Sequence, residues 1–339
     1  MHTPIFEGLW RTIFALGIAA VLLGSTLYAQ TPSPALLVLN KEDNALAIVD
    51  PVSLKVMATA PTGVGPHEVT VSDDGRWAFV SNYGTFGPNA ALGRTISVID
   101  LAMQKTVNTV DLGGMLKPHG IEFAEGEVYF TAELSRAIGR YHPGTNKIDW
   151  VMGTGQNRTH MLFPTRDVDK IITTNVDSDS ICIFERSKDP TVWSETVVAV
   201  GKGPEGGSLS PDEKEFWAAN SGDGSVSIVD MAAKKVTQTI DVGTKHSNRL
   251  HFTPDGKLVL ISDLGGGDVV IMEAGNRQIV KRINVGRNAE GILIVPDGTR
   301  AYVAASADDK VVIIDLKKLE IAGEIRTGKG PDGMAWAVR

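Results

Sequence analysis

The amino-acid sequence predicts an all-β fold, a seven-bladed β-propeller built of four-stranded antiparallel blades. Three observations support this prediction: glycines recur at a nearly constant spacing, each unit contains short strand patterns separated by turns, and the two ends of the chain complement one another. The recurring residues are Gly63, Gly113, Gly155, Gly201, Gly243, Gly286 and Gly328, at intervals of 50, 42, 46, 42, 43 and 42 residues. A period of this length is typical of stacked supersecondary units.

Within each unit, β-branched residues and tight turns alternate in the order expected of a blade. In the first unit, an Asp74-Gly75 turn is followed by strand patterns at residues 77–81, 96–100 and 106–111. Short strands separated by Asp-Gly turns at this spacing are typical of antiparallel blades.

The ends of the chain predict how the ring closes. Only one strand pattern, residues 334–338, follows the last recurring glycine, whereas three patterns at residues 36–39, 45–49 and 56–60 precede the first complete unit. One C-terminal strand and three N-terminal strands would together form a seventh blade. Closure of this kind leaves no sheet edge exposed.

Residues 1–29 are predicted to be a secretory signal peptide, and residues 30–339 a single propeller domain. Arg11 precedes an apolar run over residues 13–23, and small residues then lead to Ala29, as at a cleavage site. The run is shorter than the roughly 20 residues of a membrane-spanning helix, so we expect no membrane span in the mature protein. The expected location is periplasmic or secreted; the alternative is a retained membrane anchor.

The charge and cysteine content of the chain argue against several classes of binding partner and metal site. The chain of 339 residues carries 33 basic and 40 acidic side chains, a net charge of -7, without a basic cluster. This balance argues against nucleic acid and against an anionic membrane surface as partners. Cys182 is the only cysteine, which excludes an intramolecular disulfide and a thiolate metal cluster. Its strand-like surroundings predict a buried, inert thiol.

Several segments resemble a known family. They are the pattern Gly-x-x-Pro-x-x-apolar-x-apolar-Ser-x-Asp-Gly over residues 63–75, the segment FVSN at residues 79–82 and the segment ISVID at residues 96–100. These motifs resemble the YVTN-repeat β-propellers, exported proteins that are also similar to lactonase-like and nitrous-oxide-reductase-like propellers. The resemblance covers residues 35–339 and implies a seven-bladed ring whose inner strands line a central channel. Because such rings carry enzymes, binding scaffolds and surface-layer proteins, the resemblance selects no activity.

One position of the repeat, where each inner strand begins, carries chemically unusual residues. The seven residues at this position are His67, His119, His160, Glu205, Asn248, Glu290 and Asp332. In a closed propeller all seven would point toward one mouth of the channel. We therefore expect His67, His119 and His160, which come from neighbouring blades, to bind a divalent transition-metal ion, zinc or copper.

The other residues near this mouth are assigned catalytic and substrate-binding roles. Glu205, Glu290 and Asp332 are the predicted catalytic residues, because an ion of this kind makes water an available nucleophile and a carboxylate can act as its general base. The predicted substrate-binding residues are Lys117, Arg158, Asn248, Arg249, Tyr83 and Phe86. Tyr83 and Phe86 belong to a glycine-rich insertion, residues 83–94, which is expected to act as a lid.

The sequence thus predicts an exported metal-dependent hydrolase or lyase that acts on a small polar molecule in the central channel. One alternative is a non-catalytic module that binds a polar small molecule without metal. Another is a protein-interaction propeller of the cell envelope, and a third is a set of solvated side chains in a wet channel without a function. The sequence has no Gly-x-Ser-x-Gly elbow, phosphate-binding glycine-rich loop or His-Glu-x-x-His helix, so the corresponding enzyme classes are unsupported.

Overall fold

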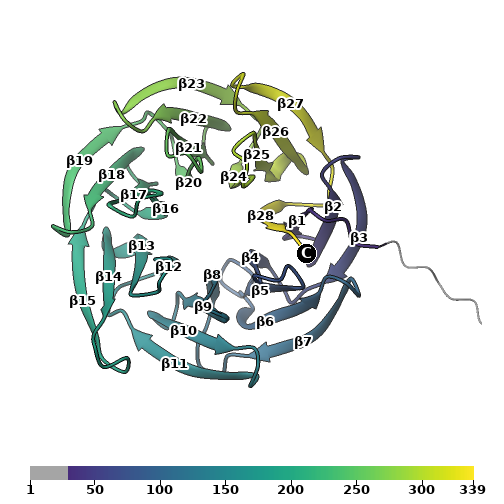
Figure 1. Cartoon of the computed structure of the whole chain (residues 1–339), viewed down its shortest axis with the longest axis horizontal. Coiled ribbons are helices and arrows are strands. Elements are labelled where there is room, and N and C mark those ends of the chain that lie inside the picture. The colour runs from purple at the N-terminus through teal and green to yellow at the C-terminus, as the bar shows by residue number, and fades with distance from the viewer. Residues whose placement is uncertain (1–29) are drawn as a thin grey trace, which may run out of the picture. The chain divides into compact units, whose positions relative to one another are not determined.

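The computed structural model describes residues 30–339, and the predicted signal peptide, residues 1–29, lies outside the described residues. Thr31–Arg339 forms one compact unit. Its strands make seven four-stranded sheets, which Figure 1 shows side by side around a ring. Neighbouring strands within each sheet are antiparallel. The predicted seven-bladed β-propeller is confirmed.

Six blades are continuous in the sequence, and each begins with its innermost strand (Figure 1). Blade one consists of β4 (Pro66–Val71), β5 (Trp77–Gly84), β6 (Leu92–Asp100) and β7 (Lys105–Asp111). Blade two consists of β8 (Pro118–Ala124), β9 (Glu127–Ala132), β10 (Ala137–His142) and β11 (Lys147–Gly153). Blade three consists of β12 (Thr159–Pro164), β13 (Lys170–Asn175), β14 (Ser180–Arg186) and β15 (Trp193–Ala199).

The next three blades follow the same order. Blade four consists of β16 (Pro204–Leu209), β17 (Glu215–Asn220), β18 (Ser225–Asp230) and β19 (Lys235–Asp241). Blade five consists of β20 (Ser247–Phe252), β21 (Leu258–Asp263), β22 (Asp268–Glu273) and β23 (Gln278–Asn284). Blade six consists of β24 (Ala289–Ile294), β25 (Arg300–Ala305), β26 (Lys310–Asp315) and β27 (Glu320–Ile325). Two short 3-10 helices, η1 (Val176–Ser178) and η2 (Ser306–Asp308), follow β13 and β25.

The seventh blade joins the two ends of the chain, as predicted. Its order is β28 (Pro331–Ala337), β1 (Ala35–Asn40), β2 (Ala45–Asp50) and β3 (Lys55–Pro61). β28 and β1 are antiparallel, with Leu36 opposite Trp336. The C-terminal strand therefore occupies the innermost place of this blade and closes the ring.

Apolar side chains between neighbouring blades form the core. Phe79 and Ile96 of blade one pack with Val128 and Phe130 of blade two, and all four are almost completely buried. Burial of a side chain of this size contributes about 1.5–3 kcal/mol. Since the other blade interfaces have equivalent clusters, each blade is held mainly by its two neighbours.

Each innermost strand departs from regular pairing near its start. In blade one the register passes from the Pro66–Asn82 pair directly to the Val69–Val80 pair. A register irregularity occurs at the equivalent place in the other six blades. A β-bulge turns the side chains of the extra residues out of the ladder. The side chain of the second residue of every inner strand is therefore turned away from the packing between blades.

Glycines bring adjacent inner strands close together at this level. The third residue of the inner strand is Gly120, Gly206, Gly291 and Gly333 in four blades. A Cβ atom on Gly291 would lie 2.2 Å from the carbonyl oxygen of Asp332, and one on Gly333 would lie 2.3 Å from the carbonyl oxygen of His67. Only glycine permits this approach of two backbones.

Two further expectations concern the membrane and the cysteine. No helix within residues 30–339 is long and apolar enough to cross a membrane. Cys182 is buried, and its thiol donates a hydrogen bond to Glu195 at 3.0 Å. Burial raises the pKa of Cys182 to about 12. The thiol is therefore protonated and unreactive, as predicted.

The close approach of the inner strands makes a prediction about stability. We expect Gly291→Ala to lower the free energy of unfolding by about 1–3 kcal/mol, because the added Cβ collides with the backbone of β28. The matched control is Gly153→Ala, where a Cβ meets nothing within 4 Å. Urea unfolding of both variants measures the difference. Equal unfolding midpoints for the two variants would contradict the role given to Gly291.

Candidate functional site at the channel mouth

The structure brings the seven predicted residues to one level of the channel. Each is the second residue of an innermost strand, and each is buried. The seven are His67, His119, His160, Glu205, Asn248, Glu290 and Asp332. Repetition of the same bulge in every blade explains this convergence, because it turns equivalent side chains toward the same mouth.

The three histidines meet side by side. The ring centroids of His119 and His160 are 3.8 Å apart, and those of His67 and His119 are 4.9 Å apart with the rings edge-to-face. Burial lowers the pKa of His67 to about 4. Burial and the neighbouring imidazoles hold the pKa of His119 well below its usual range. His67 and His119 are therefore neutral near pH 7, the form in which imidazole binds metal ions.

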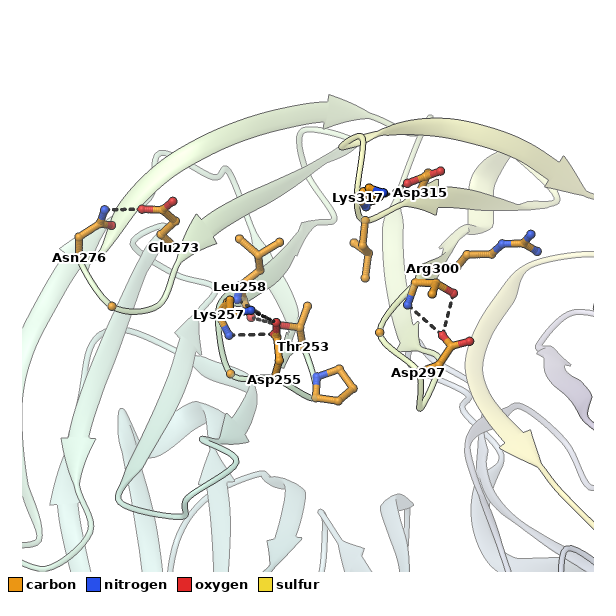
Figure 2. Close-up of a pocket in the computed structure, with 16 residues that line it drawn as sticks. Thr253, Asp255, Lys257, Leu258, Glu273, Asn276, Asp297, Arg300, Asp315 and Lys317 are labelled. Atoms are coloured by element: carbon orange, nitrogen blue, oxygen red, sulfur yellow. Dashed lines mark hydrogen bonds and ion pairs between the residues drawn. The ribbon is translucent and has the colours of Figure 1, made fainter.

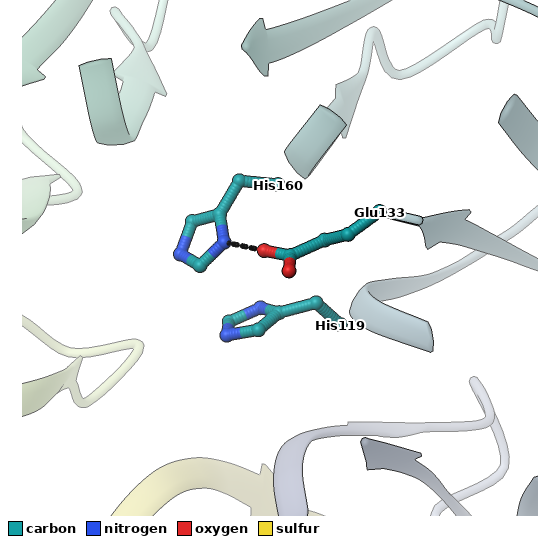
Figure 3. A group of neighbouring side chains, drawn as sticks. All are labelled: His119, Glu133 and His160. Carbon is teal, nitrogen blue, oxygen red and sulfur yellow. Dashed lines mark hydrogen bonds and ion pairs between the residues drawn. The ribbon is translucent and has the colours of Figure 1, made fainter. Parts of the chain in front are cut away.

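A residue that the sequence analysis did not predict completes the cluster. Glu133 directly follows β9, and its carboxylate contacts Nδ1 of His160 (Figure 3). It also accepts a hydrogen bond of 2.6 Å from the hydroxyl of Tyr83. Burial favours the protonated acid, but the charge of His160 and these two hydrogen bonds outweigh burial and lower the pKa of Glu133. Ligand atoms of His119, Glu133 and His160 lie within 4.8 Å of one another.

Within the described part of the chain, each of the three clustered histidines has one buried ring nitrogen without a hydrogen-bond partner. Nδ1 of His67, Nδ1 of His119 and Nε2 of His160 have no hydrogen-bond partner within residues 30–339. A buried polar atom without a partner costs free energy, and a missing ion is one of its ordinary explanations. The donor set of nitrogen and carboxylate oxygen fits zinc or copper. The residues present therefore fit the predicted metal.

Glu133 occupies a second position that recurs in every blade. In every blade, one residue at the end of the second strand donates its backbone N–H to the residue just before the inner strand, at 2.8–3.0 Å. In six blades this donor directly follows the second strand, and in blade one it is Tyr83, near the end of β5. The donors are Lys41, Tyr83, Glu133, Val176, Ser221, Leu264 and Ser306. The backbone of each donor therefore lies beside the start of an inner strand, so its side chain begins near the seven inner-strand residues. The signal that could have found Glu133 and Lys41 is the presence of polar residues at this second repeated position.

The acceptors of these seven bonds form a third repeated position. They are Gly65, Lys117, Arg158, Gly203, His246, Asn288 and Gly330. Lys117 and Arg158 have φ values of 56° and 53°, a conformation that the repeat otherwise gives largely to glycine. A side chain in this region costs roughly 1 kcal/mol or more, and such strain is concentrated at functional sites. The two predicted substrate-binding cations therefore occupy strained backbone at the mouth.

These cations already have partners. Nε of Arg158 lies 3.7 Å from Glu133, and an Nη atom of Arg158 lies 3.9 Å from Glu205. Nζ of Lys117 lies 4.1 Å from the ring centroid of Tyr83. Arg158 thus links the His119–Glu133–His160 cluster to blade four, and Lys117 covers the aromatic side of the mouth.

Glu205 forms a carboxylate–imidazole pair with His246. Nε2 of His246 lies 2.6 Å from Glu205, whose other oxygen is 3.8 Å from Nε2 of His160. Burial alone would raise the pKa of Glu205, but the hydrogen bond from His246 and the charge of His160 outweigh it and lower the pKa to about 2. That same hydrogen bond raises the pKa of His246. Glu205 is therefore a weak base that orients His246, and half-buried His246 is the better proton carrier.

Glu290 and Asp332 lie on the opposite side of the mouth, where both contact Lys41. Nζ of Lys41 lies 3.1 Å from Asp332 and also forms an ion pair with Glu290. Burial and the neighbouring Asp332 raise the pKa of Glu290 to about 7, against the opposing charge of Lys41. Burial also works against ionisation of Asp332, but Lys41 and Arg249 lower its pKa. Of the three predicted catalytic residues, Glu290 has the pKa most suited to proton transfer at neutral pH.

Arg249 lies one residue deeper in the channel and spans it. Nε of Arg249 on β20 lies 3.1 Å from Glu68 on β4, and these two strands face one another across the ring (Figure 1). Arg249 also donates to the side-chain oxygen of Asn248 at 3.3 Å. Burial opposes its charge, but Glu68 and Asp332 outweigh burial and raise the pKa of Arg249. This predicted substrate-binding cation is thus neutralised by Glu68.

The predicted lid, residues 83–94, comprises the end of β5, the loop after it and the start of β6. Its Phe86 side chain is 67% exposed, and its ring centroid lies 5.1 Å from that of Tyr83 and 5.6 Å from that of His67. Tyr83 itself stacks on His67 with a centroid separation of 4.7 Å. The aromatic pair therefore covers the histidines from the solvent side.

A groove between blades five and six is a weaker candidate for a functional site than the mouth. It encloses about 1110 Å³ and is lined by hairpin turns (Figure 2). Its carboxylates serve those turns: Asp255 accepts from Thr253 at 2.7 Å, and Asp297 accepts from Thr299 at 2.7 Å. Such hydrogen bonds are ordinary turn chemistry.

Comparisons with known proteins agree with the propeller fold. A sequence model of the YNCE-like β-propeller family matches residues 175–337. No curated protein sequence matches the chain. A periplasmic gluconolactonase from Pseudomonas aeruginosa has a similar structure, with a TM-score of 0.73 and 14% identity over 91% of this chain and 99% of that chain.

Two more solved structures share the fold. A Bacteroides uniformis protein described as a candidate 6-phosphogluconolactonase has a TM-score of 0.74 and 16% identity over 90% of this chain and 99% of its own. A Kuenenia stuttgartiensis hydrazine synthase structure has a TM-score of 0.73 and 16% identity over 87% and 98% of the two chains. Similarity at this level of identity shows the fold alone.

The Glu205–His246 pair makes a prediction about proton binding. We expect Glu205→Gln to lower the pKa of His246, because the neutral amide no longer stabilises the imidazolium. An NMR titration of the histidine ring signals measures the shift, with His142, the last residue of β10, as the internal control. Since folding raises the pKa of His246 above 6.5 and lowers that of Glu205 to about 2, the pair stabilises the fold fully between about pH 4.5 and 6.5. This contribution is lost as the pH rises through the pKa of His246 and as it falls toward that of Glu205. An unchanged titration of His246 would contradict the pairing.

Proposed function

We propose that this protein binds one divalent transition-metal ion, zinc or copper, through His119, Glu133 and His160, and acts as a hydrolase on a small polar substrate of the lactone class. The observation that carries the proposal is the convergence of two imidazoles and one carboxylate with ligand atoms within 4.8 Å of one another. Three protein ligands are typical of catalytic zinc sites, which keep one coordination position open for water or substrate.

The surroundings of the three ligands support this assignment. Tyr83 donates to Glu133 at 2.6 Å and so fixes the orientation of its carboxylate. Outer-shell partners of this kind orient ligands in metal proteins. The ring of His67 packs against His119, but His67 is not one of the three grouped residues. We therefore assign it to packing beside the ligands and not to metal binding.

Proton transfer falls to residues elsewhere on the mouth. A divalent ion at this place would polarise a substrate carbonyl group and lower the pKa of water. Glu290, with a pKa of about 7, can accept a proton near neutral pH. His246, whose imidazolium is stabilised by Glu205, can donate one to a leaving oxygen. Hydrolysis of a lactone adds water across its acyl C–O bond and yields a hydroxy acid, so one donor and one acceptor of protons suffice.

Features of the mouth motivate the substrate class. Arg158 and Lys117 supply positive charge beside the ligands, which suits the carboxylate that lactone opening generates. Phe86 and Tyr83 provide an apolar cover that can exclude water. Two proteins of similar structure are described as lactonases, one of them periplasmic. With the signal-like segment at residues 1–29, this also motivates a periplasmic or secreted location.

A second candidate is a non-catalytic propeller that binds a polar small molecule without metal. The observation in its favour is that Glu133 already has two partners, His160 and Tyr83. In that case the mouth is complete as a hydrogen-bonding site. Metal content separates the two candidates directly.

Metal analysis tests the proposed centre. Protein purified without a histidine tag is expected to hold about one equivalent of zinc or copper per chain by plasma mass spectrometry, and His119→Ala and His160→Ala are expected to lose it. The control is His142→Ala, which removes a histidine from the outer end of β10. Circular dichroism verifies that each variant is folded. A parent protein that binds neither ion after incubation with both would contradict the proposal and favour the second candidate.

The hydroxyl of Tyr83 supplies a finer test. We expect Tyr83→Phe to weaken metal affinity about 10-fold, because the ring stays stacked on His67 while the hydrogen bond to Glu133 is lost. Competition with a metal-binding dye measures the affinity. An unchanged affinity would contradict the proposal that Tyr83 orients Glu133 as a metal ligand.

Activity tests the substrate class separately. Metal-loaded protein is expected to hydrolyse glucono-δ-lactone in a pH-stat assay, and Glu290→Gln to reduce kcat at least about 100-fold with the metal retained. Stoichiometric metal without hydrolysis of this or other small lactones would leave the metal centre standing and reject the lactone substrate.

A further inference from the structure

The channel has a cavity at the end opposite the His119–Glu133–His160 cluster. This lower cavity encloses about 1160 Å³ and is lined by the innermost strands and the turns that follow them. The ion pair of Glu68 and Arg249 forms its inner end, because both residues line it and lie one residue deeper than His67 and Asn248. The pair crosses the ring between β4 and β20, so it divides the lower cavity from the mouth.

The walls of the lower cavity combine polar and apolar surface in nearly equal parts, and the apolar part includes several large side chains. Phe123, Phe163, Phe252, Leu293 and Trp336 all line it. The cavity thus suits a ligand with an apolar body.

Two polar side chains face this cavity without partners. Glu122 on β8 and His251 on β20 line it, and neither has a side-chain hydrogen bond or ion pair within residues 30–339. Burial and the nearby charge of Glu68 raise the pKa of Glu122 to about 8. Burial and Arg249 lower the pKa of His251 to about 4, so its imidazole is neutral and can accept a hydrogen bond.

The charges that line the cavity are unbalanced. Four acidic residues, Glu68, Asp73, Glu122 and Glu125, line it together with two arginines, Arg166 and Arg249. Arg249 is committed to Glu68, and Arg166 donates to Pro211 and lies 3.9 Å from Glu213. Glu122 is therefore left without a cation, and a positive charge beside it would stabilise its carboxylate.

We propose that the lower cavity binds a small organic ammonium ion with an apolar body, with the ammonium group at Glu122. The apolar body would lie against the aromatic walls, where a cation also gains from the ring faces. This site is separate from the metal centre, and it does not depend on the activity proposed for the mouth.

Isothermal titration calorimetry with three matched probes tests this site. The probes are 4-phenylbutylamine, 4-phenylbutanol and 4-phenylbutyrate, which share an apolar body and differ in charge. We expect the amine to bind with a Kd below about 1 mM and the alcohol and the acid to bind at least about 10-fold more weakly. Equal binding of the amine and the alcohol, or no binding of the amine, would overturn the proposal.

Variants locate the binding within the channel. We expect Glu122→Gln, which keeps the size of the side chain, to weaken amine binding at least about 10-fold. The double variant His119→Ala/His160→Ala is expected to bind the amine as the parent does, because it alters only the other side of the Glu68–Arg249 pair. Thermal unfolding verifies that both are folded. Unchanged binding in Glu122→Gln, or loss of binding in the double variant, would overturn the assignment to the lower cavity.

Discussion

The close approach of the seven innermost strands is the constraint on which the rest of the structure depends. Glycine at the third position of four of these strands lets neighbouring backbones lie within a few ångströms, as at Gly291 and Gly333. Apolar packing between blades presses the ring together, and the repeated bulge turns one side chain per blade out of the ladder. Residues far apart in the sequence, such as His67 and His119, are thereby held in contact.

This constraint also explains the unusual electrostatics of the channel. Charged groups are confined in a narrow, poorly solvated space, where each needs a partner or must lose its charge. Lys41, Arg158 and Arg249 form ion pairs with Glu290, Glu205 and Glu68, which belong to other blades. His67 and His119 stay neutral. The Glu68–Arg249 pair in addition divides the channel, so the two ends of one ring can hold different chemistry.

The repeat made the fold and the inner-strand residues predictable. Residues at equivalent places in a closed repeat must share one level of the channel, so His119 and His160 could be paired without a structure. Glu133 and Lys41 were missed because they belong to a different repeated position, after the second strand, whose members share no residue type. The pairing of Arg249 with Glu68 was also beyond sequence reasoning, since partners across the channel depend on its width and on which strands face one another. The roles of the site residues remain predictions.

The most direct test of the account is anomalous X-ray diffraction from crystals of the zinc-loaded protein, recorded above and below the zinc absorption edge. The account predicts one strong peak at the mouth, about 2.0–2.2 Å from nitrogen atoms of His119 and His160 and from a carboxylate oxygen of Glu133. A peak only at surface residues, or none at the mouth with the three side chains still in contact with one another, would contradict a metal centre in this propeller.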